Sequence, residues 1–208
     1  MGKLIRGAEL IIAATLLTGC LELPVQVSRD GADDAEPNAK TVSVSGQDVT
    51  LGDAAGYCIN DRQSRYTAAG AFVVMAPCSD SDEAMPTRGL VLINVLASQP
   101  LQDALKTDKM DAFFRSDEGR MALSAKGKAS DVEILGTMGS KGSYVVHSRD
   151  AAGPVIPDTS DEQWRLFMVV ADRLVSISMV NFTDAPMPDG EIFTQLEGIA
   201  RAIRALNG

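Results

Sequence analysis

The chain has 208 residues, 45% of them hydrophobic, and carries 19 Lys and Arg against 28 Asp and Glu, which gives a net charge of −9. This length fits one domain of ordinary size or two small ones, and the negative charge argues against nucleic acid as a partner, because an acidic protein repels a phosphate backbone. The single histidine, His147, excludes a metal site or a proton relay built from several histidines. No apolar run reaches the roughly 20 residues that a bilayer-spanning helix needs, which argues against a transporter or a channel.

The first segment has the organisation of an export signal. Lys3 and Arg6 precede an apolar stretch over residues 10–17, and a short positive region followed by such a stretch is typical of a secretory signal. The alternative is a buried N-terminal helix. It is not favoured, because the apolar residues would surround the helix and leave no polar face.

The residues at the end of the apolar stretch, Leu17-Thr18-Gly19-Cys20, resemble a bacterial lipobox. The resemblance implies that residues 1–19 are a signal peptide removed by cleavage and that Cys20 is lipidated. Acyl chains on Cys20 would anchor the protein to a membrane, since each buried methylene contributes about 0.8 kcal/mol. We therefore expect a lipid-anchored protein of the bacterial cell envelope that faces the periplasm. The resemblance also favours the outer over the inner membrane, because leucine and not aspartate follows Cys20.

Residues 20–40 mix acidic residues, proline, glycine and alanine without a period. This composition is typical of a solvated, flexible tether. No later linker is long enough to divide the chain, so we predict a single globular domain over residues 41–208.

Cysteine usage agrees with export. Apart from Cys20, the chain contains Cys58 and Cys78, an even pair that is expected to form a disulfide in an oxidising compartment. The alternative is two buried free thiols. Neither cysteine has the Cys-x-x-Cys spacing of a thiol catalyst.

The predicted strands follow from alternating or β-branched apolar residues between turn signals. We expect single strands at 41–45, 56–59, 71–76 and 90–97, and hairpins made by 132–137 with 143–148 and by 164–170 with 174–182. The polar residues 60–69 are predicted to be an exposed connection.

Two helical regions are predicted. The first covers residues 99–125, with Ser98 as a cap, a weak point at residues 107–108, a second cap at Ser116 and an end at Gly127. The second covers residues 189–206, where apolar residues recur at steps of 4, 3, 4 and 3 and so form one stripe on an amphipathic helix. The stripe consists of Ile192, Leu196, Ile199, Ile203 and Leu206.

These elements predict an α+β domain with a mainly antiparallel sheet packed against helices, because hairpins pair neighbouring strands in antiparallel order. The pattern is similar to the PsbP and Mog1 type of sandwich. The segments Gly56-Tyr57-Cys58-Ile59-Asn60, Gly70-Ala71-Phe72-Val73-Val74 and Ala112-Phe113-Phe114-Arg115-Ser116 also resemble a family of small alphaproteobacterial lipoproteins of unknown function. This resemblance extends over most of residues 55–206 and implies no activity.

Catalytic motifs are missing from the sequence. There is no Gly-x-Ser-x-Gly, Ser-x-x-Lys, Walker or Gly-x-Gly-x-x-Gly motif, so we predict no catalytic residue, no cofactor and no metal ligand. Burial or a surface hydrogen bond accounts for the lone His147 without chemistry.

Two classes of function remain. The favoured one is a non-enzymatic envelope module that binds a protein or another envelope component. The alternative is a hydrolase or small-ligand carrier whose site is built from dispersed residues, and a deep pocket with convergent polar groups would favour it. Tyr57, Arg62, Arg65 and Trp164 are candidates for a binding surface, because they are polar or amphipathic.

Overall fold

The computed structural model describes residues 38–78, 88–97, 105–140 and 142–208. The predicted signal peptide, the predicted lipidation site Cys20, nearly all of the predicted tether and the predicted cap at Ser98 lie outside these residues. Among the helices of the described ranges, none is long and apolar enough to cross a membrane.

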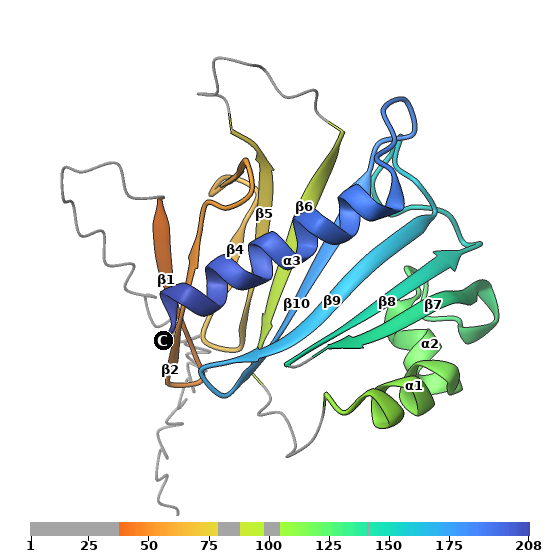
Figure 1. Ribbon diagram of the computed structural model, residues 1–208, viewed down its shortest axis with the longest axis horizontal. Coiled ribbons are helices and arrows are strands. Elements are labelled where there is room, and N and C mark those ends of the chain that lie inside the picture. Colours follow the sequence, from red (N-terminus) through yellow and green to blue (C-terminus); the bar gives the residue numbers. More distant parts are fainter. Residues whose placement is uncertain (1–37, 79–87, 98–104, 141) are drawn as a thin grey trace, which may run out of the picture.

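An eight-stranded antiparallel sheet forms the centre of the domain (Figure 1). Its order is β3-β5-β6-β10-β9-β8-β7, and β4 pairs with β5 outside this path. The strands are β3 (Tyr57–Ile59), β4 (Arg65–Thr67), β5 (Gly70–Pro77), β6 (Gly89–Leu96), β7 (Val132–Ser140), β8 (Ser143–Asp150), β9 (Glu162–Val170) and β10 (Arg173–Asn181). Every pairing in the sheet is antiparallel, and the predicted α+β fold is confirmed.

Two short strands were not predicted from the sequence. β4 lies inside residues 60–69, where an exposed connection is predicted, and its side chains are mostly exposed. Backbone pairing with β5 holds it in place, so no apolar pattern marks it. The other is β2 (Gln47–Gly52), which pairs with β1 (Ala39–Val44) through a turn at Ser45 and Gly46, both at positive φ.

The β1–β2 hairpin is fixed to the rest of the domain by two polar side chains. The buried guanidinium of Arg173 donates hydrogen bonds to the carbonyl oxygens of Val44 and Ser45, at 3.0 and 2.8 Å. Asn207 accepts from the backbone N–H of Thr50 at 2.9 Å and donates to its carbonyl oxygen at 2.8 Å. The hairpin thereby adds its valines and Leu51 to the main core.

Helix α3 (Asp189–Leu206) covers one face of the sheet and packs on β9, β10 and β2 (Figure 1). It begins at Asp189, as predicted, and four residues of the predicted stripe are buried in the core: Ile192, Leu196, Ile199 and Ile203. The amphipathic pattern therefore identifies both the helix and its buried face.

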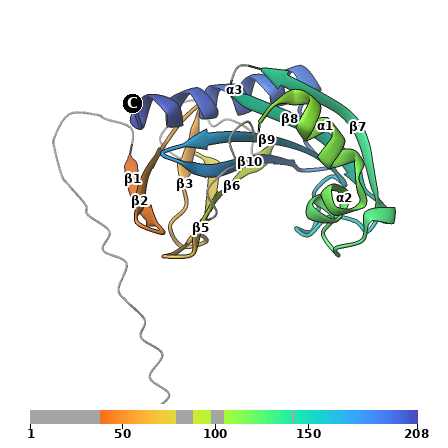
Figure 2. The ribbon, with the colours of Figure 1, turned by 90° about the horizontal axis from the view of Figure 1, so that it is seen from below.

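The opposite face carries the shorter helices α1 (Thr107–Arg115) and α2 (Asp117–Leu123) at the β7–β8 end (Figure 2). Phe114 of α1 packs there on Tyr144 and Phe167, with ring centroids 5.8 and 5.1 Å apart. The predicted cap at Ser116 is confirmed, because its hydroxyl accepts from the N–H of Gly119 at 3.2 Å.

The bounds of this helical region differ from the prediction. α1 begins at residue 107, where a weak point is predicted, and α2 ends at Leu123, four residues before Gly127. The N–H of Ser124 closes α2 by bonding to the carbonyl oxygens of Arg120 and Met121. The chain then makes a short 3-10 turn, Ala129–Asp131, before β7.

Cys58 in β3 and Cys78, the residue after β5, form a disulfide with an S–S distance of 1.99 Å. The bridge joins two neighbouring strands, since Cys58 stands opposite Ala76 in the β3–β5 register. It fastens the edge strand β3, which contributes only three residues to the sheet.

Candidate functional site

The four residues proposed for a binding surface lie in different places. Tyr57 is only 2% exposed and belongs to the core, so the prediction that it contributes to a surface is wrong. Arg62 and Arg65 are exposed beside β4, where the guanidinium of Arg65 donates to the carbonyl oxygen of Ser64 at 2.9 Å. Trp164 lies on β9, which β6 and β10 separate from β5.

Trp164 stands on the sheet face that α3 partly covers, because it alternates with Leu166 and Met168 of the main core. Its partner in the β8–β9 register is His147, whose ring stacks on the indole with the centroids 4.2 Å apart. The Nε2 atom of His147 lies 3.0 Å from a carboxylate oxygen of Glu162. His147 thus holds the indole in place through ordinary packing and one polar contact.

A row of charges borders this stack. In the described residues, Arg149 pairs with Glu133 at 3.0 Å and also contacts the carboxylate of Glu162. The hydrogen bond from Arg149 is the largest influence that lowers the pKa of Glu162, and the contact with His147 lowers it further, against the raising effect of burial. Glu162 is therefore ionised at neutral pH.

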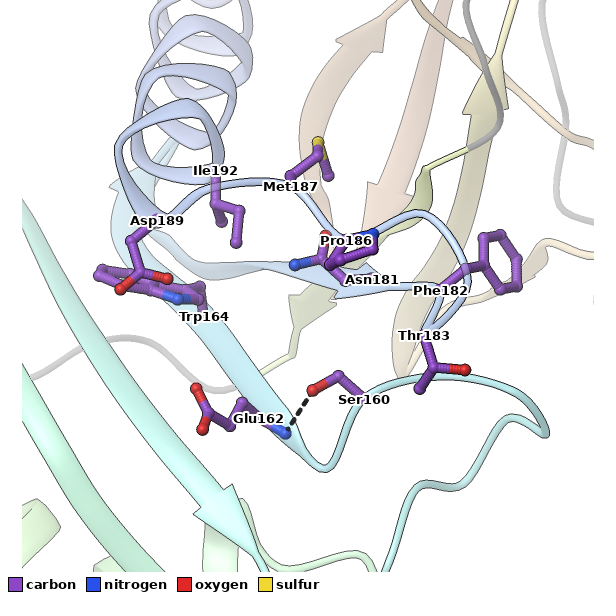
Figure 3. A pocket seen from close by; sticks show the side chains of 10 residues that line it. All are labelled: Ser160, Glu162, Trp164, Asn181, Phe182, Thr183, Pro186, Met187, Asp189 and Ile192. Carbon is purple, nitrogen blue, oxygen red and sulfur yellow. Dashed lines mark hydrogen bonds between the residues drawn. The ribbon is translucent and has the colours of Figure 1, made fainter.

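A first hollow, of about 270 Å³, lies between Trp164 and the start of α3 (Figure 3). Its lining combines two carboxylates, one indole and several apolar or uncharged polar groups: Ser160, Glu162, Trp164, Asn181, Phe182, Thr183, Pro186, Met187, Asp189 and Ile192. Among the described residues, no Lys, Arg or His lines it. The Oδ1 atom of Asn181 is buried and has no hydrogen-bond partner in the described residues.

A second hollow, of about 250 Å³, lies on the β8 side of Trp164. It is mostly apolar and is lined by Leu135, Gly136, Thr137, Met138, Val145, His147 and Trp164. Gly136 is the β7 residue opposite His147, so this row of the sheet lacks one side chain. A Cβ atom on Gly136 would meet no heavy atom within 4 Å. We call the two hollows, with the indole that divides them, the Trp164 site.

The Trp164 site consists of one indole between two small hollows. Pockets for small ligands usually enclose about 300–1,000 Å³, and neither hollow reaches that volume. In the part of the chain that the structure describes, no group of three or more His, Cys, Asp and Glu could hold a metal ion. Within the described ranges, His147 contacts an indole and a carboxylate but no hydroxyl or thiol nucleophile.

Sequence reasoning identified Trp164 but missed its neighbours. Glu162, Gly136 and Asp189 come from three different elements: the strand register places Glu162 and Gly136, and the start of α3 places Asp189. One signal was available for the second hollow: a glycine inside a strand often marks a bulge or an open position, and the β7–β8 register does shift between Ile134 and Gly136.

No protein-family model matches the chain, and no curated protein matches it significantly. Among solved structures, the chain is similar to the Saccharomyces cerevisiae Ran-binding protein Mog1p, with 12% identity, a TM-score of 0.41 and coverage of 80% of this chain and 94% of that one. It is also similar to a mutant of protein Mog1, with 14% identity, a TM-score of 0.35 and coverage of 81% and 90%. Mog1 is one of the two sandwich types named from the sequence. The fold assignment itself rests on the sheet and helices described above.

Proposed function

We propose that this protein is a lipid-anchored lipoprotein of the bacterial envelope, and that its domain is a non-enzymatic module that binds a protein partner through the Trp164 site. The observation that carries the binding role is the Trp164 site itself: one indole between two shallow hollows on the sheet face. Large aromatic side chains held in such positions dominate the energetics of many protein interfaces.

The site is ordered before any partner arrives. His147 stacks on the indole, Glu162 contacts His147, and Arg149 links Glu162 to Glu133. A partner would therefore lose little free energy to the ordering of these side chains, because the surroundings already restrict them. This supports a role in binding.

The anchor is proposed from the resemblance of residues 17–20 to a lipobox and from the charged and apolar segment before them. The Cys58–Cys78 disulfide supports the same compartment, since disulfides persist in the periplasm and are rare in the cytosol. The tether over residues 20–40 would let the domain move away from the membrane surface and reach a partner.

Photo-crosslinking in cells of the bacterium of origin tests the binding role. A photoreactive residue replaces Met138, which lines the second hollow and is 46% exposed, or Val155, which is 72% exposed and lines neither hollow. We expect a discrete protein adduct from position 138 that is absent at position 155 and is lost when Trp164→Ala is added. Equal adducts at both positions, or an adduct that survives Trp164→Ala, would show that the site is not the binding surface.

The anchor is tested by Cys20→Ser. This variant should leave the membrane fraction while its domain stays folded, because the tether separates Cys20 from the core. Fractionation, together with thermal unfolding of the released protein, measures both properties. A Cys20→Ser protein that stays in the membrane fraction would contradict lipid anchoring.

A further inference from the structure

We infer that the Trp164 site selects an extended segment of its protein partner that presents a lysine or arginine side chain to the first hollow and a large apolar side chain, two residues away, to the second. This inference rests on the proposed function and adds the chemistry of the partner. It follows from the charge and the aromatic face of the first hollow and from the shape of the second hollow.

The charge around the first hollow is negative. Two carboxylates, those of Glu162 and Asp189, line the hollow. Glu162 contacts the guanidinium of Arg149, which also pairs with Glu133. The nearby Arg88 is paired with Glu191. Asp189 makes no side-chain hydrogen bond or ion pair in the described residues. The N-terminal dipole of α3 offsets part of its charge, but the surplus carboxylate still makes the hollow favourable for a cation and unfavourable for an anion.

The other groups of the first hollow match a long basic side chain. The indole of Trp164 offers a face for a cation, and the exposed Pro186 offers apolar surface for an aliphatic stem. Lysine and arginine end in several N–H donors and no acceptor, which suits a lining that contains two carboxylates. One basic side chain would thus satisfy a charge and a ring face together.

The second hollow makes a peptide segment a better occupant than a free amine. It is apolar, and it is open because position 136 has no side chain. In an extended peptide, residues i and i+2 point to the same side and lie about 6.6 Å apart, a spacing that places one side chain on each side of a single indole. A free amine would leave the second hollow empty.

Trp164 is the only tryptophan in the chain, so its fluorescence reports on the site without a label. The full chain is titrated with three amidated, acetylated pentapeptides: Ala-Leu-Gly-Lys-Ala, Ala-Leu-Gly-Glu-Ala and Ala-Gly-Gly-Lys-Ala. Lysine stands two residues after leucine in the first peptide and two residues after glycine in the third. We expect the first peptide to change the emission saturably in the millimolar range or below. The glutamate peptide should bind about threefold more weakly or worse, because it cannot form the exposed ion pair, and so should the glycine peptide, because it has no apolar side chain to bury in the second hollow.

Two variants localise the effect. Asp189→Asn should weaken binding of the first peptide about threefold, whereas Asp184→Asn, which removes the same charge from an exposed residue that lines neither hollow, should not. Gly136→Val fills the second hollow without a clash, because position 136 is open and has no positive φ. It should abolish the preference for the leucine peptide over the glycine peptide.

The inference is overturned if no peptide changes the emission saturably, if the glutamate peptide binds as tightly as the lysine peptide, or if Asp189→Asn and Asp184→Asn behave alike. Failure here is distinguishable from failure of the proposed function. Suppose that the adduct at position 138 depends on Trp164 but is unaffected by Asp189→Asn and Gly136→Val. This result would support the proposed binding role of the Trp164 site and contradict the inferred chemistry of the partner.

Discussion

Replacing Tyr144 by phenylalanine removes a single hydroxyl group from a side chain that is 0% exposed. The hydroxyl donates a hydrogen bond to Oδ1 of Asp111 at 2.6 Å and thereby joins β8 to α1. Phenylalanine keeps the ring stacked on Phe114, so the substitution removes only the polar contacts of the hydroxyl, which include Thr137 as well as Asp111. A hydrogen bond to a charged group contributes about 1.5–3 kcal/mol. Asp111 is half-buried, and water can replace the lost donor, so we expect Tyr144→Phe to lower the free energy of unfolding by about 1.5–2 kcal/mol at pH 7.

The same bond predicts a pH dependence. Burial first, and then the bond to Asp111, raise the pKa of Tyr144 from 10.0 to about 12. A group whose folded pKa is raised stabilises the protein fully below its unfolded pKa, and this stability is lost as pH rises through the folded pKa. Two pKa units correspond to about 2.7 kcal/mol, which the wild type loses between about pH 10 and pH 12. The bond from Tyr144 is also the first cause that lowers the pKa of Asp111, so the stability that Asp111 contributes is present above its ordinary pKa of 3.8 and is lost as pH falls below it.

Urea unfolding followed by circular dichroism, at pH values from acid to alkaline, measures these effects. Tyr66→Phe is the matched control, because its hydroxyl donates to the exposed Asp61 at 2.9 Å and should contribute less than about 0.5 kcal/mol at pH 7. The stability difference between wild type and Tyr144→Phe should shrink as pH rises from 10 to 12. The reasoning is refuted if Tyr144→Phe matches Tyr66→Phe at pH 7, or if that difference stays constant across the alkaline range.

Three further substitutions test the core, the disulfide and the hairpin by chemical denaturation. Leu196→Ala should destabilise the protein by about 2–5 kcal/mol, because it opens a cavity under α3; an effect no larger than that of the exposed Thr194→Ala would contradict the packing. Cys58→Ser should lower the free energy of unfolding by about 3 kcal/mol, since the disulfide between Cys58 and Cys78 closes a loop with a sequence separation of 20. A reducing agent should destabilise the wild type but not the variant. Arg173→Met should lower the free energy of unfolding by about 2–3 kcal/mol, because the carbonyl oxygens of Val44 and Ser45 lose their charged donor. Unchanged stability would show that these two hydrogen bonds contribute nothing.

The parts of the fold that could be predicted are those encoded by local patterns. The apolar stripe of α3 has the helical period over five residues, and the two hairpins combine β-branched strands with short turns. β4 has no such pattern, because its residues are held by backbone pairing and point mostly to solvent. β2 shows a weaker pattern, with Val49 and Leu51 buried between polar neighbours. The turn before it has Ser45 at positive φ, a conformation that the residue type does not predict, because residues other than glycine rarely adopt it.

The candidate site depends on register, which a single sequence does not specify. Trp164 could be selected by residue type, but its contact with His147 requires the exact β8–β9 pairing. A shift of one residue would turn the indole to the face of α1 and α2. Tyr57 shows the converse error: an amphipathic side chain was assigned to the surface, whereas the pairing of β3 with β5 places it in the core.

The position of the Trp164 site follows from the length of α3. An 18-residue helix extends about 27 Å, and its C-terminal end is held at the β1–β2 hairpin by Asn207. The remaining turns pack on β9 and β10, and Figure 1 shows β7 lying beyond the helix. Seven strands in sequence across the sheet, at about 4.8 Å per step, already need roughly 29 Å. One helix fastened at the hairpin end therefore cannot also cover the β7 end, and the residues exposed there must either be polar or serve a partner. Arg149 with its two glutamates meets the first condition, and we propose that Trp164 beside the open position of Gly136 meets the second.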